Sequence, residues 1–178
     1  MSWRIVRSFL FSTLVLTYSA LSSQSDSLSL YLFLLDDCPI CVDYTSTLND
    51  LYEEYGDSIE FVGYFPNFTS KPEKIQRFKE TYGIQFKLDT DYYKTQASRW
   101  RATITPEVIL YNHSKSQIVY RGRIDNKFVK LGRRRYVVTQ HDLRDALRYC
   151  RSDNNMRIES TKPVGCYISY NDAISRKN

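Results

Sequence analysis

The sequence has only two histidines, His113 and His141, and no uninterrupted apolar run of the length that crosses a bilayer. A structural zinc site needs four ligands, normally from two closely paired elements, and a spanning helix needs about 18 or more apolar residues. The excess of basic over acidic residues is also small. The 25 basic and 20 acidic residues leave a formal net charge of +5, and the one dense cluster, GRRRY at 132–136, is typical of a solvated loop or a partner contact. These shortages argue against a zinc-binding module, a spanning helix and a nucleic-acid partner.

The first residues have the pattern of an export signal. Arg4 and Arg7 precede the apolar stretch FLFSTLVLTYSAL at 9–21, whose length is typical of a signal-peptide core of about 7–15 residues. Small residues at the end of this stretch offer a cleavage point. We therefore predict a signal peptide over 1–23 and a mature protein that works outside the cytoplasm. The alternative is retention of residues 8–21 as a membrane anchor.

Apolar spacing predicts alternating strands and helices. A buried strand over 27–35 leads into a helix that begins near Pro39, keeps one apolar face and ends at Gly56. The remaining predicted elements are a strand at 59–65, a helix opened by a capping box of Ser70 and Glu73 and ended at Gly83, a short strand at 86–88, a brief helix at 92–100, a hairpin of TPEVILY and QIVYRG, and a helix capped by Thr139 with Leu143, Ala146, Leu147 and Cys150 on one face. This order predicts an α/β domain over 27–151, with a mixed central sheet flanked by helices. Residues 152–178 are predicted to form an irregular tail.

The segment with chemical content is LFLLDDCPICVDY at 32–44, in which two cysteines stand two residues apart at a predicted helix start. A thiol there faces free backbone N–H groups and the positive end of the helix dipole, which stabilise the thiolate. With C-x-x-C spacing, the second thiol lies one turn further on and attacks a mixed disulfide formed by the first. We predict Cys38 as the nucleophile and Cys41 as the resolving thiol. The alternatives are half of a metal site, or a structural bridge, which closes too small a loop to stabilise much.

Two acidic residues bear on the redox character of this pair. Asp36 and Asp37 directly precede Cys38. Carboxylates close to the sulfur disfavour the thiolate. If these two carboxylates lie near Cys38, we expect a less acidic nucleophile and a more reducing couple; the alternative is that they only form a polar loop at the helix entry.

Residues 28–151 resemble a thioredoxin-fold domain of the redoxin group, the exported TlpA/ResA-like thiol-disulfide oxidoreductases. The CPIC helix start, the segment ATITPEVIL at 102–110, and the closing hairpin and helix carry the resemblance. It implies a thioredoxin-like fold, thiol-disulfide exchange without a metal or dissociable cofactor, and a cis bond between Thr105 and Pro106. These two residues are the implied substrate site, because the Thr105 backbone would be free to pair with an extended substrate strand. Glu107 is the nearest candidate for the buried acid that assists the second thiol in many thioredoxins.

The resemblance extends to the tail, where GCYI at 165–168 matches a terminal element of some exported bacterial redoxin-domain proteins. Cys166 is expected either to reach back to the active site or to form a disulfide with Cys150. The alternative for Cys150 is a buried core thiol. The implied partners are thiol or disulfide proteins of the periplasm or cell envelope, together with a membrane electron donor.

Two other functions compete with this interpretation. A peroxiredoxin-like peroxidase carries a threonine three residues before its reactive cysteine, where this chain has Leu35. A Sco-like copper-binding protein pairs two cysteines with a distant histidine, and His113 and His141 are the candidates here. Its cysteines, however, are spaced one residue wider than Cys38 and Cys41.

Overall fold

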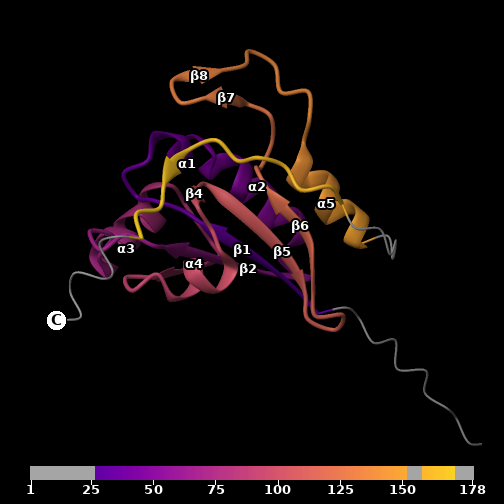
Figure 1. The fold of residues 1–178 in the computed structure, drawn as a ribbon, viewed down its shortest axis with the longest axis horizontal. Helices are drawn as coiled ribbons and strands as arrows, with labels where there is room; N and C mark the ends of the chain where they lie inside the picture. Colours follow the sequence, from indigo (N-terminus) through magenta and orange to yellow (C-terminus); the bar gives the residue numbers. More distant parts are fainter. Residues whose placement is uncertain (1–26, 152–157, 171–178) are drawn as a thin grey trace, which may run out of the picture.

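The structure is a computed structural model that describes residues 27–151 and 158–170 (Figure 1). The predicted signal peptide over 1–23 lies outside the described residues. Within the described ranges, no helix combines the length and the apolar character needed to traverse a bilayer.

A five-stranded mixed sheet forms the centre of the domain, in the order β3-β2-β1-β5-β6. The strands are β1 (Leu28–Phe33), β2 (Ile59–Phe65), β3 (Lys87–Thr90), β5 (Glu107–Asn112) and β6 (Gln117–Gly122). β1, β2 and β3 are parallel, whereas β5 runs antiparallel to both β1 and β6. The apolar runs of β1, β2 and β5 are buried along most of their length, as in strands covered on both faces.

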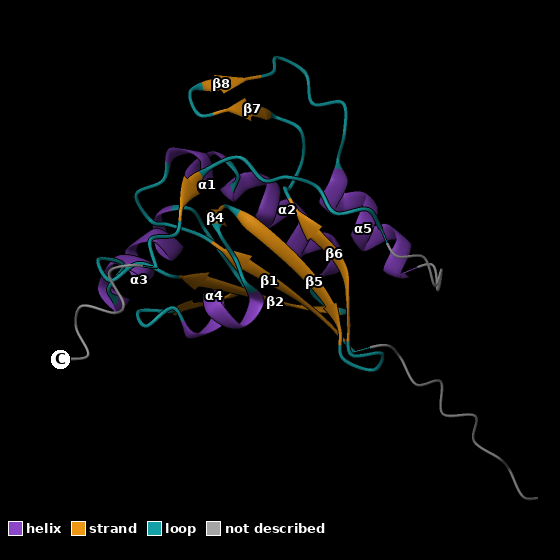
Figure 2. Cartoon of the chain, viewed as in Figure 1, coloured by secondary structure: helices purple, strands orange, loops and turns teal. Residues whose placement is uncertain are grey.

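Helices cover both faces of this sheet (Figure 2). They are α1 (Pro39–Asp43), α2 (Thr45–Tyr55), α3 (Pro72–Thr81), α4 (Thr95–Trp100) and α5 (Asp142–Arg151). The larger core joins apolar side chains of α1, α2, α3 and α5 to one face. A smaller core gathers residues of α4 with Phe33, Ile109 and Ile168 on the other face. The predicted α/β architecture, a mixed sheet flanked by helices, is confirmed.

The long helix predicted to begin at Pro39 is interrupted. Its backbone breaks at Tyr44, because the Thr45 hydroxyl donates a hydrogen bond to the Val42 carbonyl at 2.8 Å and competes with the regular helix. Gly56 follows α2 in a right-handed conformation rather than the left-handed one typical of a glycine at this position. The first segment, α1, is therefore a separate short helix that carries the CPIC turn.

Two predicted helix caps are wrong for a common reason: their hydroxyls bind distant partners. The Ser70 hydroxyl donates to Asp36, so the capping box with Glu73 does not form and α3 begins two residues after Ser70. The Thr139 hydroxyl accepts a hydrogen bond from the Asn126 side chain at 2.7 Å, and α5 begins three residues later. In both cases a tertiary contact replaces a local one.

Two short elements beside the cysteines are not apparent from the sequence. The first is a hairpin of β7 (Phe128–Lys130) and β8 (Arg133–Arg134), which projects beyond the sheet (Figure 1). Lys127 and Arg134 form ion pairs with Asp43 of α1. The basic cluster is therefore attached to the helix that carries the second cysteine.

The second element lies in the C-terminal tail, which follows the surface of the domain. Ile158 and Thr161 donate backbone N–H groups to two carbonyls of β6 and so cover the outer edge of the sheet. The chain then crosses to β4 (Ile104–Thr105) and pairs with it, antiparallel, as β9 (Cys166–Tyr167). The tail, which was predicted to be irregular, thus contains a short strand that lies beside Cys38.

Candidate active site

The first turn of α1 holds the two cysteines of the CPIC segment just beyond the end of β1. Cys38 is the N-cap residue, and Pro39 takes the first helical position, where its missing N–H is not needed. Cys41 lies one turn inside and is fully buried, and its sulfur accepts a hydrogen bond from the Leu35 N–H at 3.4 Å. Cys38 is covered too, with only 1% of its surface exposed. The nucleophile predicted from the sequence is therefore not open to solvent in this conformation.

The surroundings of Cys38 favour the thiolate. Its pKa is lowered from 9.0 to about 5, chiefly because the Cys41 thiol donates a hydrogen bond to it. Burial opposes this shift, while the Cys166 thiol and the backbone N–H groups of Cys41 and Ile40 add to it. Burial, followed by the adjacent Cys38 sulfur, raises the pKa of Cys41. Near neutral pH the first sulfur is an anion and the second keeps its proton, which suits a nucleophile and a resolving thiol.

The predicted effect of the two aspartates on Cys38 is wrong. Asp36 is engaged elsewhere, since its carboxylate accepts a hydrogen bond from Ser70. Asp37 acts on the third thiol: together with burial and the Cys38 sulfur, which act more strongly, it raises the pKa of Cys166 to about 11. Because a stabilised thiolate stabilises the reduced protein, the geometry favours a more oxidising couple than the sequence predicts.

β4 and Pro106 lie against the cysteine pair. The bond between Thr105 and Pro106 is cis, as the resemblance implies. The Cys38 sulfur lies 3.8 Å from the Thr105 carbonyl oxygen and so contacts this strand. The expectation that Thr105 is free to pair with a substrate strand is wrong for this conformation. β9 already occupies that edge, and the Thr105 hydroxyl donates to the Cys166 carbonyl at 3.3 Å.

The position of the tail cysteine distinguishes the two arrangements expected for it. The Sγ of Cys166 lies 3.1 Å from the Sγ of Cys38, within hydrogen-bonding distance for sulfur. Cys150 lies on α5, half-buried and packed against the larger core. Cys166 therefore faces the CPIC pair rather than Cys150, and three of the four cysteines gather at the start of α1.

The tail approaches this closely because of Gly165. A Cβ atom at this position would lie 1.9 Å from the Thr105 carbonyl oxygen and 3.1 Å from the Pro106 ring. Three residues further on, Ile168 is buried in the smaller core and donates its N–H to the Thr103 carbonyl at 2.9 Å. GCYI is thus a docking segment with a close backbone contact at one end and an apolar anchor at the other.

A buried acid lies near the site, but it is not the one expected. Because side chains alternate between the two faces of a strand, Glu107 lies on the face of β5 that packs against the smaller core, on the other side of the sheet from α1. There it forms an ion pair with Arg121 at 2.7 Å. Asp125 instead accepts a hydrogen bond from the Tyr44 hydroxyl at 2.5 Å, and both residues line a small cavity beside Pro106. No local pattern marks Asp125, because its partner is 81 positions away in the sequence.

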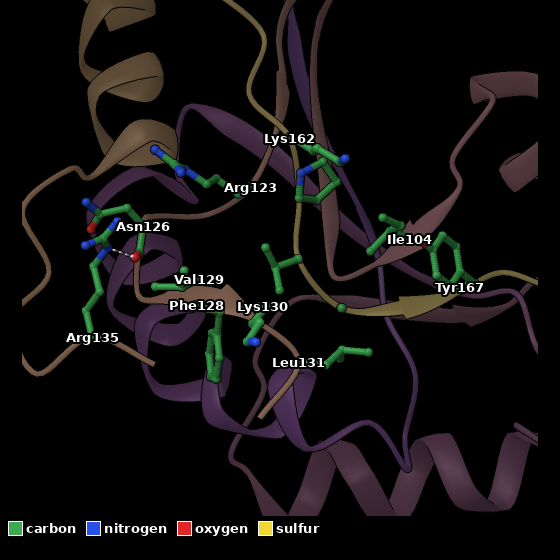
Figure 3. Close-up of a pocket in the computed structure, with 13 residues that line it drawn as sticks. Ile104, Arg123, Asn126, Phe128, Val129, Lys130, Leu131, Arg135, Lys162 and Tyr167 are labelled. Carbon is green, nitrogen blue, oxygen red and sulfur yellow. Dashed lines mark hydrogen bonds between the residues drawn. The ribbon is translucent and has the colours of Figure 1, made fainter. Parts of the chain in front are cut away.

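A groove of about 580 Å³ opens between the hairpin and the tail, beside β4 and β9 (Figure 3). Apolar and cationic side chains line it: Ile104, Phe128, Val129, Leu131, Pro163, Val164 and Tyr167 with Arg123, Lys130, Arg135 and Lys162. Within the described part of the chain, the lining includes no acidic residue. Shape and charge therefore suit an extended segment that carries apolar and acidic side chains.

The two histidines give no support to a copper site. The Nε2 of His113 lies 2.9 Å from the Ser29 hydroxyl, at the end of β1 opposite the cysteines. His141 is exposed, immediately before α5. Among residues 27–151 and 158–170, no group of three or more His, Cys, Asp or Glu side chains is placed to hold a metal ion. Leu35, where a peroxidase has its hydroxyl, is buried.

Comparison with known proteins identifies the fold. No family model and no curated protein matches the chain. Among solved structures, it is similar to a hypothetical protein from Sinorhizobium meliloti 1021, with 24% identity and a TM-score of 0.70 over 81% of this chain and 80% of that one. It is also similar to an uncharacterized conserved protein from Geobacillus kaustophilus, with 24% identity and a TM-score of 0.67 over 82% of this chain and 78% of that one. A candidate thioredoxin from Neisseria meningitidis has 15% identity and a TM-score of 0.55 over 74% of this chain and 79% of that one. The fold is thioredoxin-like, as predicted.

Proposed function

We propose that this protein is an exported thiol-disulfide oxidoreductase that exchanges disulfides with other proteins through Cys38 and Cys41. The observation that carries the proposal is a thiolate-favouring cysteine at the start of α1 beside a buried, proton-bearing cysteine one turn away. The contact between Cys38 and the Thr105 carbonyl supports it, because it puts the nucleophile beside a strand edge at which a polypeptide can pair.

In the exchange reaction, the Cys38 thiolate attacks a substrate disulfide. One substrate sulfur leaves as a thiolate and takes up a proton, and the other becomes joined to Cys38. Deprotonated Cys41 then attacks the Cys38 sulfur, which releases the second substrate thiolate and leaves a Cys38–Cys41 disulfide. The reverse sequence oxidises a substrate dithiol. The stabilised Cys38 thiolate favours this reverse direction, because it is a good leaving group. Thr105 and Pro106 flank the mixed disulfide, and no dissociable cofactor takes part.

The groove beside the site supports a choice of substrate. Lys130 and Lys162 lie on it among apolar side chains. Segments with acidic and apolar residues next to their cysteine therefore fit it best. On the strength of the sequence pattern at 1–23, we place the reaction in the periplasm or cell envelope. Its partners there are exported proteins with thiols or disulfides, and a membrane protein that exchanges electrons with the CPIC pair.

A redox titration tests the proposal. The full chain is equilibrated in graded glutathione buffers, alkylated, and mapped by mass spectrometry, and we expect a reversible Cys38–Cys41 couple. Cys38→Ser should abolish exchange with a peptide disulfide. Cys150→Ser removes a thiol on α5 and should leave exchange intact. Exchange that persists without Cys38 would contradict the mechanism.

A further inference from the structure

We propose that Cys166 is a second redox partner of Cys38, so that the oxidised protein interconverts between a Cys38–Cys41 and a Cys38–Cys166 disulfide. The inference rests on the function proposed above and adds a residue to its reaction. The two sulfurs of Cys38 and Cys166 are 3.1 Å apart, about 1 Å more than the ~2.05 Å of a disulfide bond. A small movement of β9 closes that gap.

β9 holds its cysteine where the cysteine of a bound substrate strand would lie. It pairs antiparallel with β4 and sets Cys166 opposite Thr105, on the edge beside the nucleophile. Anchors lie on both sides of Cys166: the close approach of Gly165 to the Thr105 carbonyl, and the buried side chain of Ile168. The tail is therefore an intramolecular substrate whose thiol is held at a fixed place.

The interconversion needs no external oxidant or reductant. Starting from the Cys38–Cys41 disulfide, the Cys166 thiolate attacks the Cys38 sulfur. The Cys38–Cys166 bond forms, the Cys38–Cys41 bond breaks, and Cys41 leaves as a thiolate that takes up the proton Cys166 gave up. Burial raises the pKa of both Cys41 and Cys166. Near neutral pH, whichever of the two thiols is not joined to Cys38 therefore holds its proton.

The two disulfides differ in what they leave accessible. In the Cys38–Cys166 form, β9 is covalently bound over the nucleophile, and a protein substrate cannot reach it. In the Cys38–Cys41 form, the same strand is held by hydrogen bonds and apolar contacts alone, so that a competing strand can displace it. Exchange between the two forms therefore controls access to the site.

The test uses the full chain with Cys41→Ser, which removes the competing partner. The variant is treated with oxidised glutathione, quenched with acid, alkylated and mapped by mass spectrometry. Because the structure holds Cys166 beside Cys38, the internal Cys38–Cys166 disulfide should exceed the Cys38–glutathione adduct by at least about tenfold. A dominant glutathione adduct with alkylated Cys166 would overturn the proposal.

Two further variants in the Cys41→Ser background serve as controls. Gly165→Val keeps Cys38 and Cys166 but forces side-chain atoms against the Thr105 carbonyl. The internal disulfide should give way to the glutathione adduct, and an undiminished internal disulfide would show that docking of β9 does not place the thiol. Cys150→Ser should change neither product.

The proposed function is tested separately, in a chain that carries only Cys166→Ser. A reversible Cys38–Cys41 disulfide should still form there, because both of its sulfurs are kept. Its absence would count against the proposed function, whereas absence of the Cys38–Cys166 disulfide in Cys41→Ser counts only against the further inference.

Discussion

The pKa of Cys38 determines the reactivity proposed for this protein, and it is open to direct measurement. A thiolate absorbs in the far ultraviolet where a thiol does not. The absorbance of the reduced protein minus that of Cys38→Ser, followed over pH, therefore reports ionisation of this sulfur. We expect a midpoint of about 5 rather than the 9.0 of an ordinary thiol. At pH 7 the sulfur should then be about 99% thiolate, against about 1% without the shift.

Replacement of Cys41 by alanine tests the cause of the shift. The Cys41 thiol makes the strongest of the contacts that stabilise the Cys38 thiolate. A hydrogen bond to a charged group contributes about 1.5–3 kcal/mol. At about 1.36 kcal/mol per pKa unit, its loss should raise the midpoint by about 1–2 units. Cys166→Ala should raise the midpoint by less, because its contact is the weaker of the two side-chain contacts.

The same shift predicts how the stability of the reduced protein depends on pH. The pKa of Cys38 is lower in the folded protein, about 5, than its ordinary value of 9.0. The thiolate therefore contributes fully above about pH 9, and the contribution is lost as the pH falls to about 5. The melting temperature of the reduced protein, relative to Cys38→Ser, should fall over this range. In the ultraviolet titration, a Cys38 midpoint at or above pH 8, or a midpoint that Cys41→Ala does not change, would refute the reasoning.

Contacts around the site give three more expected outcomes. Tyr44→Phe leaves the buried Asp125 carboxylate without its hydroxyl donor and should lower the free energy of unfolding by about 1–3 kcal/mol in a urea titration; unchanged stability would mean that the bond contributes nothing. Charge reversal of the groove with Lys130→Glu and Lys162→Glu should raise the KM for an acidic peptide disulfide about tenfold and leave kcat unchanged. The effect should shrink with added salt, and an equal effect on a neutral peptide would contradict the charge argument. Glu107→Ala removes the carboxylate partner of the partly buried Arg121, which keeps its hydrogen bonds to the Trp100 and Arg101 carbonyls, and should lower the free energy of unfolding by up to about 3 kcal/mol. Its exchange rate should not change, because this pair lies on the other face of the sheet, and a large loss of activity would show that the carboxylate serves the thiols.

Local periodicity was sufficient to predict most of the domain. The helix predicted between Pro39 and Gly56 buries Leu48 and Leu51 on one side, and the helix predicted after Thr139 buries Leu143 of its predicted face. One-sided burial of a helix imposes this spacing on the sequence itself. The CPIC segment was placed correctly for a related reason: an apolar strand, two acids and a proline at the first helical position are all local signals.

Contacts between distant segments could not be predicted in this way. The expected helix cap at Ser70 and the expected charge effect of Asp36 on Cys38 fail together, because the hydroxyl and the carboxylate bind each other across 34 positions. A polar side chain near a helix start favours a local cap only when no distant partner competes. The Tyr44–Asp125 bond is a further case, since neither residue carries a periodic signal for it.

The burial of Cys38 is consistent with the proposed reaction if a substrate strand displaces β9 from β4. Only 1% of the Cys38 surface is exposed, so under the proposed function a protein substrate would reach the sulfur only after β9 moves. β9 pairs with β4 over two residues, and so short a pairing breaks more easily than any strand of the central sheet. A substrate strand that makes the same backbone bonds and also fills the adjoining groove gains contacts that the tail lacks. Under the proposed function, a substrate that makes only the contacts of the tail gains nothing by displacing it, and the tail would therefore set a threshold for specificity.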